Sequence, residues 1–154
     1  MLSFAGIACA SAVAGAQTAT QTVTFAVNAI NMISISGAPS LTVSTAVAGS
    51  QPTSATDATS LWAVTTNQSG AKISASIPSA MPAGLTLKVN LTAPGGATSA
   101  GLQSLGTSAV DLVTVITKTA VGSLNATYQL DATVAAGVVA SSTRLVTYTI
   151  SGGT

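Results

Sequence analysis

Apolar and polar residues alternate with a period of two along most of the chain from residue 22 onward. The clearest alternating run is Leu85, Leu87, Val89 and Leu91. A period of two places successive side chains on opposite faces of a β-strand, and the many Val, Ile, Thr and Tyr residues suit half-buried strands. No apolar stripe with helical spacing follows residue 16, so the pattern predicts an all-β protein.

The alternating segments predict about eight or nine strands, spaced roughly ten to fifteen residues apart as in a β-sandwich. They lie at residues 22–35, 61–66, 72–77, 85–91, 103–105, 110–117, 124–134 and 145–150. Segment 110–117 is a more continuous apolar run than the others, which predicts a strand buried on both faces. Asn31 interrupts the first segment, so we expect a bulge or bend there. Residues 45–60 are small and polar around Pro52 and predict a loop with at most a short edge strand.

We therefore expect one domain over residues 17–154, an antiparallel β-sandwich that is Ig-like or jelly-roll-like. Residues 1–16 are apolar and small, and they end in the Ala-Gly-Ala of residues 14–16. This predicts a signal peptide cleaved before Gln17, and hence an extracellular or cell-surface protein. A lipoprotein signal ending at Cys9 is the alternative, with a shorter apolar run. About 20 apolar residues are needed to span a membrane, so no span is expected in the mature chain.

Charge is scarce, since the formal net charge of +1 comes from four cations and three anions with no histidine. The charged residues are Lys72, Lys88, Lys118, Arg144, Asp57, Asp111 and Asp131. Nucleic-acid binding needs a basic stripe, which four scattered cations do not make. A surface built of Ser, Thr, Ala, Asn and Gln has little repulsion to keep copies apart, and a net charge near zero favours association.

The same inventory argues against an enzyme. General acid–base catalysis needs a histidine or paired carboxylates, and the three aspartates are far apart in sequence. Serine without a base is a weak nucleophile, and the single cysteine falls within the predicted leader. We expect no cofactor and no metal site. A calcium ion held by Asp57 and carbonyl groups is the minority alternative.

A monomeric adhesin or carbohydrate-binding module is an alternative function. Sugar recognition usually relies on aromatic platforms. After the predicted leader the aromatic residues are Phe25, Trp62, Tyr128 and Tyr148. Glycans are also possible as attached groups, because Asn-x-Ser/Thr sequons occur at Asn67, Asn90 and Asn125.

Alternate threonines suggest a third function, the binding of ice or a mineral surface. They are Thr18, Thr20, Thr22 and Thr24, with short echoes at residues 117–119 and 147–149. Such a surface needs threonines repeated across several paired strands. Cross-strand Thr pairs are also common as ordinary exposed β residues.

The run from Thr20 to Ser36, TQTVTFAVNAINMISIS, precedes short Thr/Val-rich segments and the sequence MPAGLTL at residues 81–87. Together they resemble secreted bacterial β-sandwich proteins of surface fibres and coats, whose pilin-like subunits are strand-complemented. The paired cysteines common in chaperone–usher pilins are absent. The resemblance implies a homopolymer: a structural subunit of an extracellular filament, a pilus-like fibre or a surface coat.

A physical argument for self-association stands beside the resemblance. Charged residues normally protect sheet edges from pairing with other chains, and few are available here. An N-terminal strand over residues 17–30 can leave its own domain and complete a neighbour's sheet. Its apolar residues for this role are Val23, Phe25, Val27 and Ala29, with about 1.5–3 kcal/mol expected from burying each of the large ones. Pairing as an ordinary first strand within its own sheet is the equal alternative.

Overall fold

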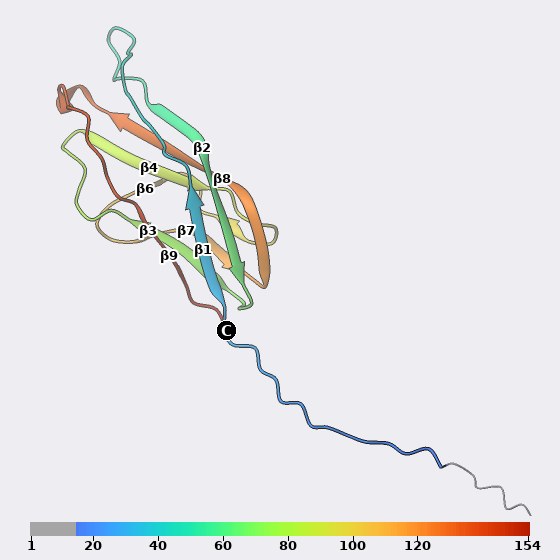
Figure 1. The fold of residues 1–154 in the computed structure, drawn as a ribbon. Coiled ribbons are helices and arrows are strands. Elements are labelled where there is room, and N and C mark those ends of the chain that lie inside the picture. Colours follow the sequence, from blue (N-terminus) through green and yellow to red (C-terminus); the bar gives the residue numbers. More distant parts are fainter. Residues whose placement is uncertain (1–14) are drawn as a thin grey trace, which may run out of the picture.

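Nine β-strands and one short helix make up the fold in the computed structural model, which describes residues 15–154 (Figure 1). The strands are β1 (Asn31–Ser36), β2 (Ala55–Thr66), β3 (Ala71–Ser76), β4 (Leu85–Leu91), β5 (Thr98–Ser99), β6 (Gln103–Ser104), β7 (Val110–Ile116), β8 (Thr119–Ala132) and β9 (Thr147–Ser151). The helix is a single 3-10 turn, η1 (Val134–Ala136). Within residues 15–154 no helix has the length and apolar character of a membrane span. The predicted leader lies outside the described residues, except for its last two.

The strands form two antiparallel sheets. One has five strands in the order β1-β2-β8-β4-β6, and the other has four in the order β5-β7-β3-β9. The larger sheet is curled, since the long strands β2 and β8 bend along their length (Figure 1). The predicted antiparallel β-sandwich with eight or nine strands is confirmed.

The core lies between the two sheets. Its largest fully buried side chains are Trp62, Ile73, Ile77, Leu91, Leu112 and Ile116. The alternation predicted for residues 85–91 is confirmed, because Leu87, Val89 and Leu91 are buried while Lys88 and Asn90 between them are half-buried. Burial of each large apolar side chain contributes about 1.5–3 kcal/mol, which is why this alternation fixes the face that each strand turns inward.

Strand β2 is longer than the sequence predicts. We expected residues 45–60 to form a loop, but β2 begins at Ala55 and pairs there with the far half of β8. Ser60 within it is 1% exposed. Residues 55–59 are half-buried or exposed and have no large apolar side chain, so pairing with the long strand β8, and not local hydrophobicity, determines their conformation.

Strand β7 is buried on both faces only at its centre. Leu112 and Val113 are adjacent and both fully buried, as predicted for a strand enclosed on two sides. Val115 is 55% exposed and has a φ of 60°, a left-handed conformation that is uncommon for a β-branched residue. The exposure of Val115 is therefore a local departure from the predicted pattern.

The predicted first strand, residues 22–35, divides into two parts. Only the part from Asn31 onward is a strand, and its register with β2 runs without a break from Asn31 opposite Thr66 to Ser36 opposite Leu61. The bulge expected near Asn31 is absent from this register. Asn31 instead marks the place where pairing of β1 with β2 begins.

Candidate assembly site

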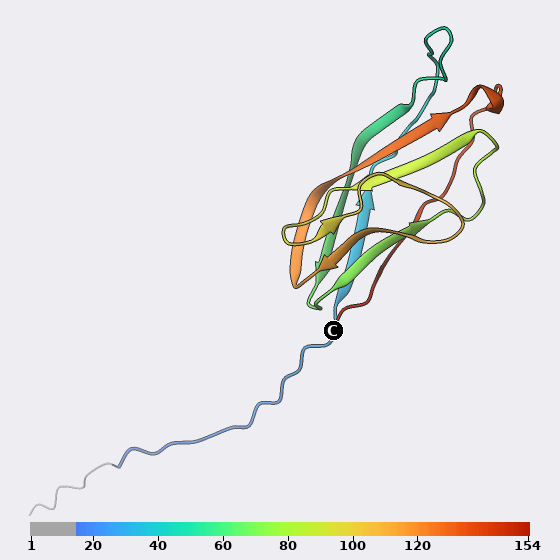
Figure 2. The same ribbon diagram turned by 180° about the vertical axis from the view of Figure 1, so that it is seen from behind.

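Residues 17–30, called the arm from here on, form an extended segment that leaves the sandwich and points away from it (Figures 1 and 2). Val23, Phe25 and Val27 are 72%, 89% and 80% exposed. Ala29 is exposed as well. The residues predicted for strand donation thus lie on a segment that belongs to neither sheet of its own chain.

The arm has the geometry and chemistry of an unpaired β-strand. Side chains two residues apart lie on the same side of an extended chain, so Val23, Phe25 and Val27 form one apolar edge. Residues 17–30 carry no charge. Fourteen extended residues reach at most about 50 Å, and β8, the longest strand of the sandwich, has the same number of residues. Large apolar side chains this exposed are typical of a surface that binds a partner.

The base of the arm is held by Asn67, just after the end of β2. The Asn67 backbone N–H donates to the Ile30 carbonyl at 3.2 Å. Its side-chain Oδ1 accepts the Ile30 N–H at 2.8 Å, and its Nδ2 donates to the Asn28 carbonyl at 2.8 Å. Asn67 therefore makes three hydrogen bonds to residues 28–30 and continues the pairing of β1 with β2 into the arm.

A second layer of polar contacts fixes the orientation of Asn67. Gln68 Nε2 donates to Asn67 Oδ1 at 2.8 Å, and the Gln68 backbone N–H donates to Thr66 Oγ1 at 3.0 Å. Thr66 is 3% exposed, and its hydroxyl donates to Asn31 Oδ1 at 2.6 Å. The amide of Asn67 is thus part of a network that begins at a buried side chain.

One side of the sandwich has two unpaired strand edges. Among residues 15–154, β1 pairs only with β2, and β9 pairs only with β3. The two strands lie beside each other across the sandwich, and Asn31 Nδ2 donates to the Gly152 carbonyl at 3.5 Å. No backbone hydrogen bond joins β1 to β9 among the residues of the described range. We call this the open side.

The free backbone groups of β1 follow from its register. The bond from the Asn67 N–H to the Ile30 carbonyl makes residues 30 and 67 a hydrogen-bonded pair. Hydrogen-bonded and non-bonded pairs alternate in an antiparallel ladder. The N–H and C=O groups that turn away from β2 toward the open side are therefore those of Asn31, Ile33 and Ile35.

The same reasoning locates the free groups of β9. Ser69 and Thr154 exchange two backbone hydrogen bonds, at 2.9 and 3.1 Å, and so form a bonded pair. Counting along the register of β3 with β9 gives the residues whose backbone groups turn outward. These residues are Thr147, Thr149 and Ser151. Two edges with unused donors and acceptors thus face one side of the molecule.

The open side is lined by apolar side chains that the core covers only in part. Ile33 and Leu41 come from β1 and the chain that follows it. Val146, Tyr148 and Ile150 come from β9 and the residue before it. All five pack against the core and stay partly exposed. An added strand along this side would complete their burial.

The opposite side of the sandwich is closed by a single segment that supplies both β5 and β6. Ala100 N–H donates to the Leu112 carbonyl at 2.8 Å, and Leu105 N–H donates to the Leu87 carbonyl at 2.8 Å. Ile77 N–H donates to the Gly106 carbonyl at 2.9 Å, which ties this segment to the other sheet. Leu105 is 6% exposed. This segment therefore links the two sheets on the closed side and buries Leu105 against the core.

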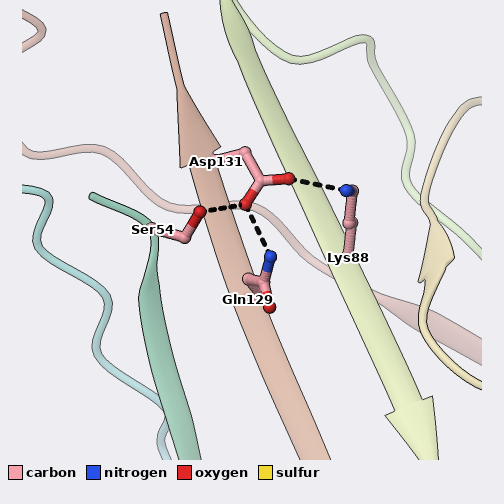
Figure 3. A network of polar contacts seen from close by, with 4 residues as sticks. All are labelled: Ser54, Lys88, Gln129 and Asp131. Atoms are coloured by element: carbon pink, nitrogen blue, oxygen red, sulfur yellow. Dashed lines mark hydrogen bonds and ion pairs between the residues drawn. The ribbon is translucent and has the colours of Figure 1, made fainter. Parts of the chain in front are cut away.

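The carboxylate with the largest number of partner residues is that of Asp131 on the larger sheet (Figure 3). Asp131 on β8 forms an ion pair with Lys88 on β4 at 2.6 Å. Its other oxygen accepts hydrogen bonds from Ser54 Oγ at 2.6 Å and Gln129 Nε2 at 2.7 Å. The Lys88 ammonium, followed by Ser54 and Gln129, lowers the pKa of Asp131 to about 2. This carboxylate joins three adjacent chain segments and is fully ionised at neutral pH.

The other two aspartates also have partners. Asp57 Oδ1 accepts the hydroxyl and the backbone N–H of Thr59, at 2.6 and 2.9 Å, and Oδ2 accepts the Ser40 N–H at 3.1 Å. These hydrogen bonds, those from Thr59 first, lower the pKa of Asp57. Lys72 Nζ lies 3.1 Å from Asp111 Oδ2 at the surface. No group of three or more His, Cys, Asp or Glu side chains gathers within residues 15–154.

The aromatic residues do not form an exposed platform. Trp62 and Tyr128 are 1% and 6% exposed, and the hydroxyls of Tyr128 and Tyr148 share a hydrogen bond of 2.6 Å. Burial raises the pKa of both tyrosines. Phe25, on the arm, is the one fully exposed aromatic side chain of the described chain. The core thus uses the aromatic residues that a flat sugar-binding surface would need.

The alternate threonines at residues 18–24 lie on the arm and not on a sheet. They have no neighbouring strand that repeats them across a flat surface. A threonine array of the kind that ice binding needs is therefore not formed by these four residues within one copy.

The chain matches no protein-family model, no curated protein and no solved structure. The site therefore rests on its own geometry. Alternation in the sequence indicated Val23, Phe25, Val27 and Ala29. In the sequence Asn67 carries a glycosylation sequon and begins the turn expected at residues 67–70, directly after the predicted strand at 61–66, and this position is the feature that points to a capping role.

Proposed function

We propose that this protein is a structural subunit of an extracellular filament or surface coat, in which the arm of one copy binds along the open side of the next. The observation that supports this most is the presence of two complementary, unused features in one chain. The arm exposes Val23, Phe25 and Val27, and the open side has two unpaired edges over a partly covered core. Export follows from the predicted leader.

The chemistry of the two surfaces is compatible. Residues 17–30 have no charged side chain, and neither β1 nor β9 contains a charged residue. No charged side chain is therefore desolvated when the arm binds between them. The backbone of the arm supplies hydrogen-bond partners for the free N–H and C=O groups of Asn31, Ile33 and Ile35. The apolar side chains of the arm cover Ile33 and Tyr148. Main-chain bonds provide affinity and side-chain packing provides register in this mode of binding.

The arrangement also sets the type of assembly. Each copy has one arm and one open side, and these are different surfaces. A contact between different surfaces is heterologous, and it builds an open filament unless the rotation happens to close a ring. The near-zero net charge adds little repulsion between successive copies.

Removal of the arm is the direct test. We compare the chain starting at residue 17 with one lacking residues 17–27, which keeps Asn28 and Ile30, the two residues that Asn67 binds. Electron microscopy and sedimentation should show filaments or ladders for the first and a folded monomer for the second. A synthetic peptide of residues 17–30 should bind the truncated protein.

A matched pair of variants tests whether assembly needs the apolar side chains of the arm or only the presence of the segment. Serine at Val23, Phe25 and Val27 should abolish assembly. Serine at Thr20, Thr22 and Thr24, on the opposite edge of the same arm, should leave it intact. Filaments that form without residues 17–27, or a full chain that stays monomeric at millimolar concentration, would contradict the proposal. Selective binding on a glycan array by such a monomer would favour the adhesin instead.

A further inference from the structure

We propose that Asn67 acts as a clamp that sets the direction of the arm, so that the arm serves a neighbouring copy and does not fold back onto its own open side. The use of this clamp in assembly rests on the proposed function. The clamp itself is a property of one chain and can be tested in one chain.

The geometry of Asn67 is that of a substitute peptide group. Its own backbone N–H pairs with the Ile30 carbonyl, in register with the last strand pair, Asn31 opposite Thr66. The side-chain carbonyl then takes the Ile30 N–H, and the side-chain NH₂ reaches back to the Asn28 carbonyl. The sheet is thereby prolonged past the end of β2, and residues 28–30 are held in line with β1.

This direction matters because the arm joins the molecule at its own open side. The edge of β1 begins at Asn31, immediately after the arm. A reversal within residues 28–31 would lay the arm antiparallel along β1 as a hairpin. Two of these residues, Asn28 and Asn31, are asparagines, which are well suited to turns. The sequence alone therefore permits the reversal.

A tethered arm would also have a large concentration advantage for its own chain. Short flexible connections give effective concentrations in the millimolar range, well above those at which separate copies meet. The arm therefore binds its own open side in preference to that of another copy, unless the chain is prevented from reversing at residues 28–31. Reversal at residues 28–30 would break the three bonds to Asn67, and Gln68 Nε2, at 2.8 Å from Asn67 Oδ1, holds the amide in the orientation that makes them.

Single-molecule Förster transfer between dyes on Thr24→Cys and Ser50→Cys measures the direction of the arm. Thr24 lies on the arm and Ser50 in the loop at the far end of the sandwich (Figure 1). The two positions are about 70 Å apart when the arm continues the line of β1, and less than half of that when it folds back. The other cysteine, Cys9, is removed with the leader or replaced by serine. Picomolar dilution prevents assembly, so only intrachain distances contribute.

The native chain should show low transfer. Asn67→Ala removes both side-chain bonds. Each bond contributes a factor of about 2 to 12 to the equilibrium between outward and folded-back arms, so the variant should raise the ratio of folded-back to outward arms about tenfold or more. Asn67→Asp keeps the bond to the Ile30 N–H and loses the one to Asn28, so it should fall between the two. Asn125→Ala, at an exposed asparagine of β8, is the control and should match the native chain.

The outcomes separate the clamp from the proposed function. High transfer in Asn67→Ala supports the clamp even if the native protein never forms filaments. Unchanged low transfer in both Asn67 variants overturns the clamp even if filaments are abundant. If the native chain assembles, Asn67→Ala should yield closed monomers that do not bind the peptide of residues 17–30, and monomers that still bind it would contradict self-occupancy.

Discussion

The two sides of the sandwich differ in whether the chain's own residues cover the edges of the sheets. On the closed side, one segment supplies β5 and β6, and backbone bonds at Ala100, Leu105 and Ile77 seal both sheets. On the open side, β1 and β9 lie together without a backbone bond, and the side chains beneath them stay partly exposed. The comparison shows that open edges are not a general result of low charge, because this chain can close an edge with its own residues.

Position in the sequence explains part of this difference. The closed side is sealed by a segment with strands before and after it, which is held at both ends. The open side meets the arm at Ile30 and Asn31, where the side chain of Asn67 holds the last residues of the arm in line with β1. The unpaired arm therefore joins the sandwich directly at β1, one of the two unpaired edges of the open side.

Matched leucines on the two sides should show the largest difference. Leu105→Ala removes a side chain that is 6% exposed and should cost about 2–5 kcal/mol of unfolding free energy. Leu41→Ala on the open side should cost the dilute monomer about half as much, because solvent already reaches Leu41. Urea denaturation measures both. Equal losses would mean that the open side is as well packed as the closed one.

Leu41→Ala should have the larger effect when peptide binding is measured instead of stability. Leu41→Ala should weaken binding of the peptide of residues 17–30 by about tenfold, because a packed contact is lost in the complex. Leu105→Ala should leave peptide affinity unchanged in protein that is still folded. Isothermal titration with each variant gives the comparison. Weaker binding by Leu105→Ala alone would place the acceptor on the other side.

Phe25→Ala should separate stability from binding within the arm. Phe25 is 89% exposed and has no packing to lose in the monomer, so the unfolding free energy should change by less than about 0.5 kcal/mol. In the assembled state the loss should be about 1.5–3 kcal/mol, or roughly 10- to 150-fold in affinity. Thr24→Ala is the control on the opposite edge. A destabilised monomer would show that the arm packs on its own sandwich.

Acid should weaken the middle of the larger sheet, which both sides share. The pKa of Asp131 is lowered to about 2 from 3.8, so its contribution to stability is full above about pH 4 and is lost as the pH falls toward 2. Asp131→Asn should cost about 1 kcal/mol at pH 7 and almost nothing at pH 2. Urea midpoints at pH 7, 4 and 2 test this. A gap between the two proteins that persists at pH 2 would assign the effect to packing.

Sequence patterns predicted the regular parts of the fold because alternation reports burial directly. Leu85 to Leu91 and residues 110–116 lie within the predicted segments. The start of β2 was missed, since Ala55 and Ser60 are too small to show which face is inside. Residues 22–29 alternate as well as any strand. Alternation shows that one face seeks burial, but it does not show whether the partner is the same chain or another copy.

The acceptor was less predictable than the arm for a similar reason. An open side is a relation between β1 and β9, which are separated by most of the chain and come together only in the folded sandwich. No local pattern marks either strand as an edge. Asn67 was predicted as a turn residue with a sequon but not as a partner of the arm, because a hydrogen bond to a residue 37 positions away leaves no periodic signal.

The smallest effect concerns the contact that joins the two sheets close to the open side. Tyr128 on β8 and Tyr148 on β9 share a hydrogen bond of 2.6 Å between their hydroxyls. Tyr148→Phe or Tyr128→Phe should each cost about 0.5–1 kcal/mol, because one hydroxyl loses its partner. The double variant should cost less than the sum of the two, since removing both partners leaves no unsatisfied group. Additive losses in urea denaturation would show that the hydroxyls act separately, and β9 would then be held at the open side by its pairing with β3 and by apolar packing alone.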